Sequence, residues 1–243
     1  MRLSCEYETE EIPLSYQMLF VSLIKEALKE SDEEFQDKLY NYDKNRRNKQ
    51  SKDFTFGVYL KEFEKKEDIF KIDDRVILNF STPNYKLAVK FYNGLLKLGE
   101  FEYKNFLLEK LRINLEKEKE IKDKKIRFKT LSPVCIKNEN NHFLDLDDKN
   151  YEKELNYIAN IVLENYRGYG LKEELKFKPL DMDKVVVKQK IKEFTENTGR
   201  EYYYVNSYQG SFELKGARED LQDIYMLGLG FKRNQGFGML EVI

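Results

Sequence analysis

The chain has 243 residues, with 43 Lys and Arg against 44 Asp and Glu, which gives a formal net charge of -1 at pH 7. This balance is not that of a globally basic nucleic-acid-binding protein, so any such site has to be a local basic patch. The 41% of hydrophobic residues suffice for the core of one large or two small domains.

The sequence also limits where we expect the protein to work. No stretch approaches the roughly 20 apolar residues of a membrane span, and no signal-peptide pattern follows Met1. The two cysteines, Cys5 and Cys135, lie in apolar alternating runs without metal-ligand spacing, and we predict that both are reduced core thiols. We therefore expect a cytoplasmic protein without membrane contact, metal or cofactor.

The first half predicts alternating strands and helices. Residues 3–7 alternate between apolar and polar and indicate a strand. Apolar residues then recur on one helical face, at Leu14, Met18, Val21, Ile24 and Leu28. The further predicted elements are a helical piece at 32–40, a polar and basic loop at 41–50, strands at 54–60 and 76–80, a helix at 84–98 and a strand at 106–113. The order β-α-β-β-α-β is that of a ferredoxin-like domain.

Residues 116–125 are almost entirely charged and predict a solvated linker between domains at 1–115 and 126–243. The second half repeats the element order less cleanly. Its predicted elements are a strand at 126–136, a returning hairpin strand at 142–146, a helix at 151–166, strands at 185–194 and 202–214, a helix at 217–227 and a strand at 237–242. The predicted fold class is α+β, with two ferredoxin-like (RRM-like) domains in tandem, the second less regular.

The last sixteen residues contain the most specific pattern. Gly228-Leu229-Gly230 and Gly236-Phe237-Gly238 bracket five residues that include two cations and two amides. Glycine lets a backbone approach a ligand closely, and successive N–H groups in such loops form anion-binding concavities. A phosphate backbone would suit this loop, whereas the alternative is a glycine-rich turn packed against a helix. The predicted RNA-binding residues here are Gly228, Gly230, Lys232, Arg233, Asn234, Gln235, Gly236 and Gly238.

This loop resembles the signature motif of the CRISPR repeat-RNA processing endoribonucleases, the sixth CRISPR-associated protein family. Residues 128–134 look like the opening of that family's second half, and residues 52–56 are similar to the strand after its active-site loop. The resemblance implies tandem ferredoxin-like domains, binding of precursor and mature CRISPR RNA, and metal-independent transesterification by a 2′-hydroxyl. It also implies transfer of the product to an interference complex, and it leaves a homodimer open.

The expected catalytic residues follow from the same resemblance. The family's usual set is a Tyr from the first helix, a His from the next loop and a Lys before the next strand. Lys25 falls at the Tyr position and Lys52 at the Lys position, while Tyr40 or Arg46 falls at the His position. The predicted catalytic residues are thus Lys25, Tyr40, Arg46 and Lys52, and Lys44, Arg47 and Lys49 are predicted to bind RNA. A solvated basic loop is the alternative.

The sequence departs from the family in the position of its histidine. The only one, His142, falls in a predicted hairpin tip outside the family's active-site region. Lysine and tyrosine have ordinary pKa values of about 10.4 and 10, so neither is a ready base at pH 7 unless its pKa is depressed. We therefore expect slow cleavage. The alternatives are a non-catalytic repeat-RNA binder and a structural subunit of a CRISPR ribonucleoprotein complex.

Overall fold

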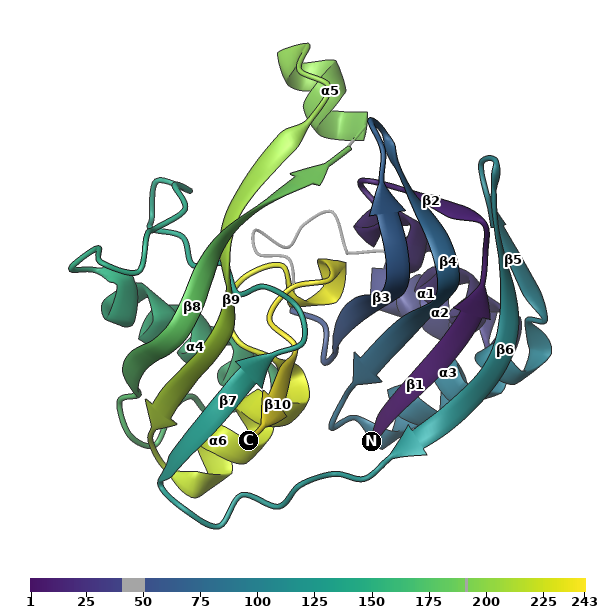
Figure 1. Ribbon diagram of the computed structural model, residues 1–243. Helices are drawn as coiled ribbons and strands as arrows, with labels where there is room; N and C mark the ends of the chain where they lie inside the picture. The colour runs from purple at the N-terminus through teal and green to yellow at the C-terminus, as the bar shows by residue number, and fades with distance from the viewer. Residues whose placement is uncertain (41–50, 191) are drawn as a thin grey trace.

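The computed structural model describes residues 1–40, 51–190 and 192–243. Figure 1 shows two antiparallel sheets side by side, each with helices of its own half packed against it, and the C-terminal loop between them. Each half has its own hydrophobic core, which confirms the predicted tandem arrangement.

The first half follows the predicted order. Its main elements are β1 (Arg2–Glu8), α1 (Gln17–Ser31), β3 (Thr55–Lys65), β4 (Ile69–Ser81), α3 (Tyr85–Lys97) and β6 (Phe106–Glu116). The strands pair in the antiparallel order β3-β4-β1-β6, the order of a ferredoxin-like sheet. Three short elements add to it: β2 (Glu11–Pro13), α2 (Glu33–Tyr40) and β5 (Glu100–Tyr103).

The second half has the same topology. It contains β7 (Lys125–Thr130), α4 (Tyr151–Arg167), β8 (Lys176–Gln189), β9 (Tyr203–Lys215), α6 (Arg218–Leu227) and β10 (Leu240–Val242). Its strand order, β10-β7-β9-β8, repeats that of the first half. The additions are the helix α5 (Lys192–Thr198) and the 3-10 turn η1 (Arg233–Gln235).

Three sequence predictions need correction. The strand predicted at 185–194 is β8, which begins earlier, at Lys176, and ends at Gln189. Residues 192–194 of the predicted strand belong to α5 instead. The predicted strand at 126–136 ends at Thr130, because the following backbone bonds to the C-terminal loop, with the Leu131 N–H donating to the Met239 carbonyl at 2.7 Å. The charged linker is not wholly solvated, since Ile121 is buried in the second core.

Polar contacts hold the halves together beside the C-terminal loop. The Thr55 hydroxyl donates to the Phe237 carbonyl at 3.0 Å, and the Ser132 hydroxyl donates to the Phe56 carbonyl at 3.0 Å. All four residues are buried. Because buried polar groups that lose their partners are costly, these bonds fix the loop against the start of β3.

Two other expectations concern buried thiols and membrane contact. Cys5 and Cys135 are both free and buried, as predicted, and burial raises the pKa of the Cys135 thiol to about 12. Among the described helices, none has the length and apolar character needed to cross a membrane.

Candidate functional site

The C-terminal glycine loop owes its shape to backbone conformations that favour glycine. Gly228, Gly230, Gly236 and Gly238 have φ angles of 84°, 87°, 83° and 72°. A Cβ atom on Gly238 would lie 2.1 Å from the Leu229 carbonyl oxygen, and the Leu229 N–H donates back to the Gly238 carbonyl at 2.9 Å. Close approach of the two Gly-apolar-Gly steps accounts for Gly228 and Gly238, whereas Gly230 lies against the Cys135 carbonyl and Gly236 against Phe56. Contact of these glycines with RNA stays a prediction.

Arg233 is buried and bonded within the protein. Its guanidinium donates to the Leu227 carbonyl and to the Ser51 hydroxyl, and only 5% of the residue is exposed. Burial lowers the pKa of Arg233 to about 10, although the Asp53 carboxylate nearby favours the charged form. In the structure this guanidinium joins the loop to Ser51, the residue before Lys52, and the predicted phosphate contact of Arg233 stays a prediction.

Lys232 is the half-buried cation of the loop. It has a left-handed backbone conformation with a φ of 59°, just before η1. Its ammonium donates to the side-chain carbonyls of Gln189 at 3.0 Å and Gln235 at 2.9 Å. It also lies 5.0 Å from the centre of the Tyr203 ring.

A pocket of about 570 Å³ lies where the loop meets the first half. The predicted catalytic residues Lys25, Tyr40 and Lys52 line it together with Lys232 and Arg233. Its other lining residues are Met18, Val21, Ser51, Ile158, Val162, Gly230, Phe231, Asn234 and Gln235. None of the described residues of this lining is acidic, so the pocket is a local basic patch in a chain of balanced charge.

The first-half residues of the pocket gather around one aromatic ring. The ammonium of Lys25 lies 4.7 Å and that of Lys52 4.6 Å from the centre of the Tyr40 ring. Lys25 extends from the third turn of α1, Tyr40 ends α2, and Lys52 precedes β3. A cation within about 6 Å of a ring centre is attracted by the ring's quadrupole, so Tyr40 positions both ammonium groups.

The remaining predicted residues divide into two groups. Lys44, Arg46, Arg47 and Lys49 lie outside the described residues. His142 lies in an exposed turn, where its backbone N–H donates to the side-chain oxygen of Asn138 at 3.0 Å, and it does not line the pocket. The predicted turn is thus confirmed. Ile158 and Val162 of α4 form an apolar wall of the pocket that was not predicted, because their helical spacing indicated only a core face.

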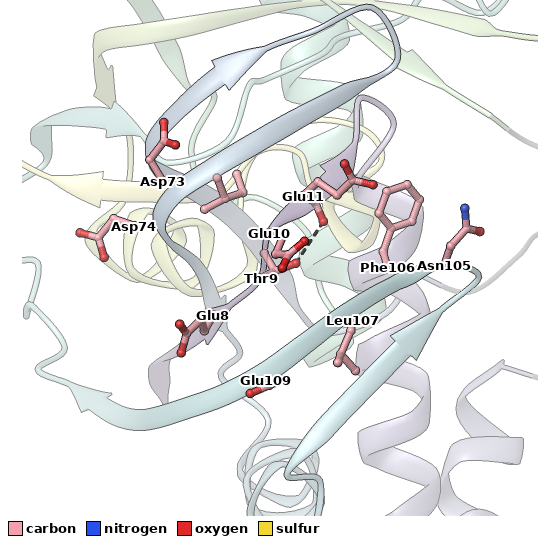
Figure 2. A pocket seen from close by; sticks show the side chains of 11 residues that line it. Glu8, Thr9, Glu10, Glu11, Asp73, Asp74, Asn105, Phe106, Leu107 and Glu109 are labelled. Atoms are coloured by element: carbon pink, nitrogen blue, oxygen red, sulfur yellow. Dashed lines mark hydrogen bonds between the residues drawn. The ribbon is translucent and has the colours of Figure 1, made fainter.

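A second pocket, at an end of the first sheet, has the opposite charge. Figure 2 shows acidic side chains around it from β1, β2, β4 and β6 and from the turn between β1 and β2. The acidic residues are Glu8, Glu10, Glu11, Asp73, Asp74 and Glu109. Like charges repel, so a polyanion is disfavoured here and favoured at the basic pocket. Among the described residues, no group of three or more His, Cys, Asp or Glu could hold a metal ion.

Comparison with known proteins gives matches along nearly the whole chain. Residues 116–242 match the C-terminal domain of the CRISPR associated protein Cas6, and residues 11–112 match a Cas6 N-terminal domain. The CRISPR-associated endoribonuclease Cas6 1 of Methanocaldococcus jannaschii is 27% identical over 264 residues, which cover 99% of this chain and 92% of that protein.

Solved structures give the same fold. The product of a Cas6-related gene from Pyrococcus furiosus has a TM-score of 0.79 and 21% identity, and the match covers 100% of this chain and 98% of that one. A RAMP protein described as binding different RNA substrates has a TM-score of 0.80 and 20% identity, covering 100% of this chain and 99% of that one. These likenesses confirm the predicted fold class.

Proposed function

This chain belongs to the Cas6 family of CRISPR-associated proteins, and on that premise we propose that it is an endoribonuclease that binds and cuts CRISPR repeat RNA. The observation that supports this most directly is the basic pocket, in which Lys25, Tyr40 and Lys52 of the first half meet the glycine loop of the second. The RNA backbone lies across this junction, with the scissile phosphate beside the two ammonium groups.

The proposed reaction is an attack by the ribose 2′-hydroxyl on the adjacent phosphorus. The bond to the 5′-oxygen breaks, which leaves a 2′,3′-cyclic phosphate and a 5′-hydroxyl. Negative charge accumulates on the phosphorane, and preorganised cations in a partly dry site stabilise it more than they stabilise the starting phosphodiester. Lys25 and Lys52 are held on one ring, so little reorganisation is needed when this charge develops.

Single-turnover cleavage of the protein's own repeat RNA, at saturating protein and with EDTA present, tests this function. We expect the wild type to cleave with EDTA, and Lys25→Ala or Lys52→Ala to slow cleavage by about 10²-fold, the usual loss for one group that stabilises an oxyanion. Lys29→Ala is the matched control, since Lys29 is an exposed lysine one turn further along α1 and outside the pocket lining.

A non-catalytic repeat-RNA binder is the second candidate, and the position of the sole histidine favours it. His142 lies in an exposed turn outside the pocket, so the usual proton-transfer group of the family is absent from the described site. Tight binding of repeat RNA without cleavage over a wide range of pH would establish this candidate and refute the endoribonuclease. Loss of cleavage on adding EDTA would refute metal independence alone.

A further inference from the structure

Lys232 is chemically the most unusual side chain of the basic pocket. It lines the pocket together with Lys25, Tyr40 and Lys52, although it comes from the opposite end of the chain. Its left-handed backbone, between two positive-φ glycines, is a conformation that lysine rarely adopts. The loop therefore holds this side chain in one place.

The surroundings of the Lys232 ammonium contain amides rather than carboxylates. It donates to Gln189 at 3.0 Å and to Gln235 at 2.9 Å. None of the ion pairs among the described residues includes Lys232. Gln189 is fully buried, so one of the two acceptors has a fixed position.

Other charged and titratable groups lie on the segments that pack around the Lys232 amine. Lys137 lies on the same Tyr203 ring, 5.8 Å from its centre, and donates to the Tyr203 hydroxyl at 3.1 Å. The Cys135 thiol lies beneath the loop, and Lys25, Lys52 and Tyr40 line the same pocket. The pKa of Lys232 is lowered to about 8, chiefly because its amine is removed from water; Cys135 opposes this shift and Lys137 adds to it.

The two hydrogen bonds of Lys232 are compatible with the neutral amine. A neutral lysine has two N–H groups and one lone pair, whereas an ammonium has three N–H groups. Two amide oxygens accept from Lys232, so in the neutral form both N–H groups have partners among the described residues, and the lone pair is the position that these two bonds do not use. With a pKa of about 8, about a tenth of the molecules carry this neutral amine at pH 7.

We propose that Lys232, in the C-terminal glycine loop, is the general base of RNA cleavage and so takes the proton-transfer role for which the first-half loop offers no histidine. This inference rests on the proposed endoribonuclease function. The Lys232 amine takes the proton of the 2′-hydroxyl, the 2′-oxygen forms a bond to phosphorus, and the bond from phosphorus to the 5′-oxygen breaks. The 5′-oxygen takes a proton from the ammonium of Lys52 or Lys25. Lys232 then gives its proton to water, and Lys52 or Lys25 takes a proton back from water, so both groups return to their starting forms.

The test separates a base from a cation that only binds phosphate. Lys232→Arg keeps the positive charge but does not titrate in the working range, because the arginine pKa exceeds 12. For the wild type we expect the single-turnover rate to rise tenfold per pH unit and to level off at about pH 8. For Lys232→Arg we expect a rate lower by about 10²-fold or more, without that inflection, and repeat-RNA affinity within about threefold of the wild type.

Lys137→Met is the matched second variant. It removes the neighbouring ammonium and leaves Lys232 in place, so the inflection should move to higher pH while the plateau rate is kept. A merely structural role of the loop would not produce this shift. A wild-type rate and pH profile in Lys232→Arg would overturn the proposal and make Lys232 a phosphate-binding residue.

A measurement without cleavage distinguishes failure of this inference from failure of the proposed function. The pH dependence of acetylation of Lys232 by acetic anhydride, followed by mass spectrometry, gives the pKa of its amine directly, with Lys29 as the exposed reference. We expect a midpoint near 8 for Lys232. A midpoint near the ordinary value of about 10.4 would refute the general base even if the wild type cleaves RNA.

Discussion

Replacement of Gly238 by alanine tests why the C-terminal loop needs its glycines. The φ angle of 72° at this position costs about 1–2 kcal/mol for a residue with a Cβ atom. The new Cβ would also lie 2.1 Å from the Leu229 carbonyl oxygen, a backbone atom in a buried loop. Overpacking of this kind costs about 1–3 kcal/mol, so we expect a total loss of about 3 kcal/mol.

Two other glycines serve as matched controls. Gly168 caps α4 with a φ of 85°, but a Cβ there meets no atom within 4 Å, so Gly168→Ala should cost only the backbone term of about 1 kcal/mol. Gly99 lacks a positive φ and is equally open, so Gly99→Ala should change the stability by less than about 1 kcal/mol. The three substitutions thus separate backbone conformation from close packing.

Thermal unfolding measures the difference. For a chain of this length, each kcal/mol lowers the Tm by about 2–4 °C, so Gly238→Ala should lower it by roughly 6–12 °C and Gly168→Ala by roughly 2–4 °C. Equal losses in the two variants would show that the approach to Leu229 is unimportant. A normal Tm in Gly238→Ala, together with lost RNA binding, would instead support the sequence-based idea that the glycine admits the RNA backbone.

Further predictions concern the pocket and the sole histidine. Arg233→Ala should lower the free energy of unfolding by about 2–4 kcal/mol in urea titration, because it leaves the buried Leu227 carbonyl and the Ser51 hydroxyl without their charged donor; a stability unchanged from the wild type would show that this contact is unimportant. Tyr40→Phe should cleave RNA within about threefold of the wild-type rate because it keeps the ring under both ammonium groups, whereas Tyr40→Ala should be more than about 10-fold slower; equal rates in the two variants would contradict the positioning role. His142→Ala should retain the rate within about threefold, and a loss near 10²-fold without unfolding would place the catalytic site elsewhere.

The element order was predictable from hydrophobic periodicity, and the departures have physical causes. Leu87, Phe91 and Leu95 recur at helical spacing and are all buried in α3. No strand was predicted for the first half of β8, because Pro179 has no backbone N–H to donate to a neighbouring strand. β8 is an edge strand whose register to β9 shifts between Pro179 and Asp181, so the proline is accommodated there. β2 and β5 are too short to show a period.

The site was only partly predictable, because its contacts join distant parts of the chain. Lys25, Tyr40 and Lys52 were placed by family resemblance, and the structure brings all three to one pocket. The burial of Arg233 could not be predicted, since its partner Ser51 lies 182 residues away and a cation in a glycine loop ordinarily faces water. The same holds for Gln189, whose place beside Lys232 depends on the pairing of β8 with β9.

The segregation of charge explains how a chain with a net charge of -1 can hold a polyanion. Lys25, Lys52, Lys232 and Arg233 share one pocket without an acidic residue in its described lining, while the acidic side chains of Figure 2 gather at an end of the first sheet. Four cations in one pocket repel one another in the free protein, and a bound phosphate relieves that repulsion. The pKa of Lys232 has a different main cause, because its removal from water lowers that pKa most and the ammonium of Lys137 lowers it less. In the proposed RNA site, Lys25 and Lys52 therefore supply the attraction for phosphate, whereas burial in the glycine loop favours a neutral amine at Lys232.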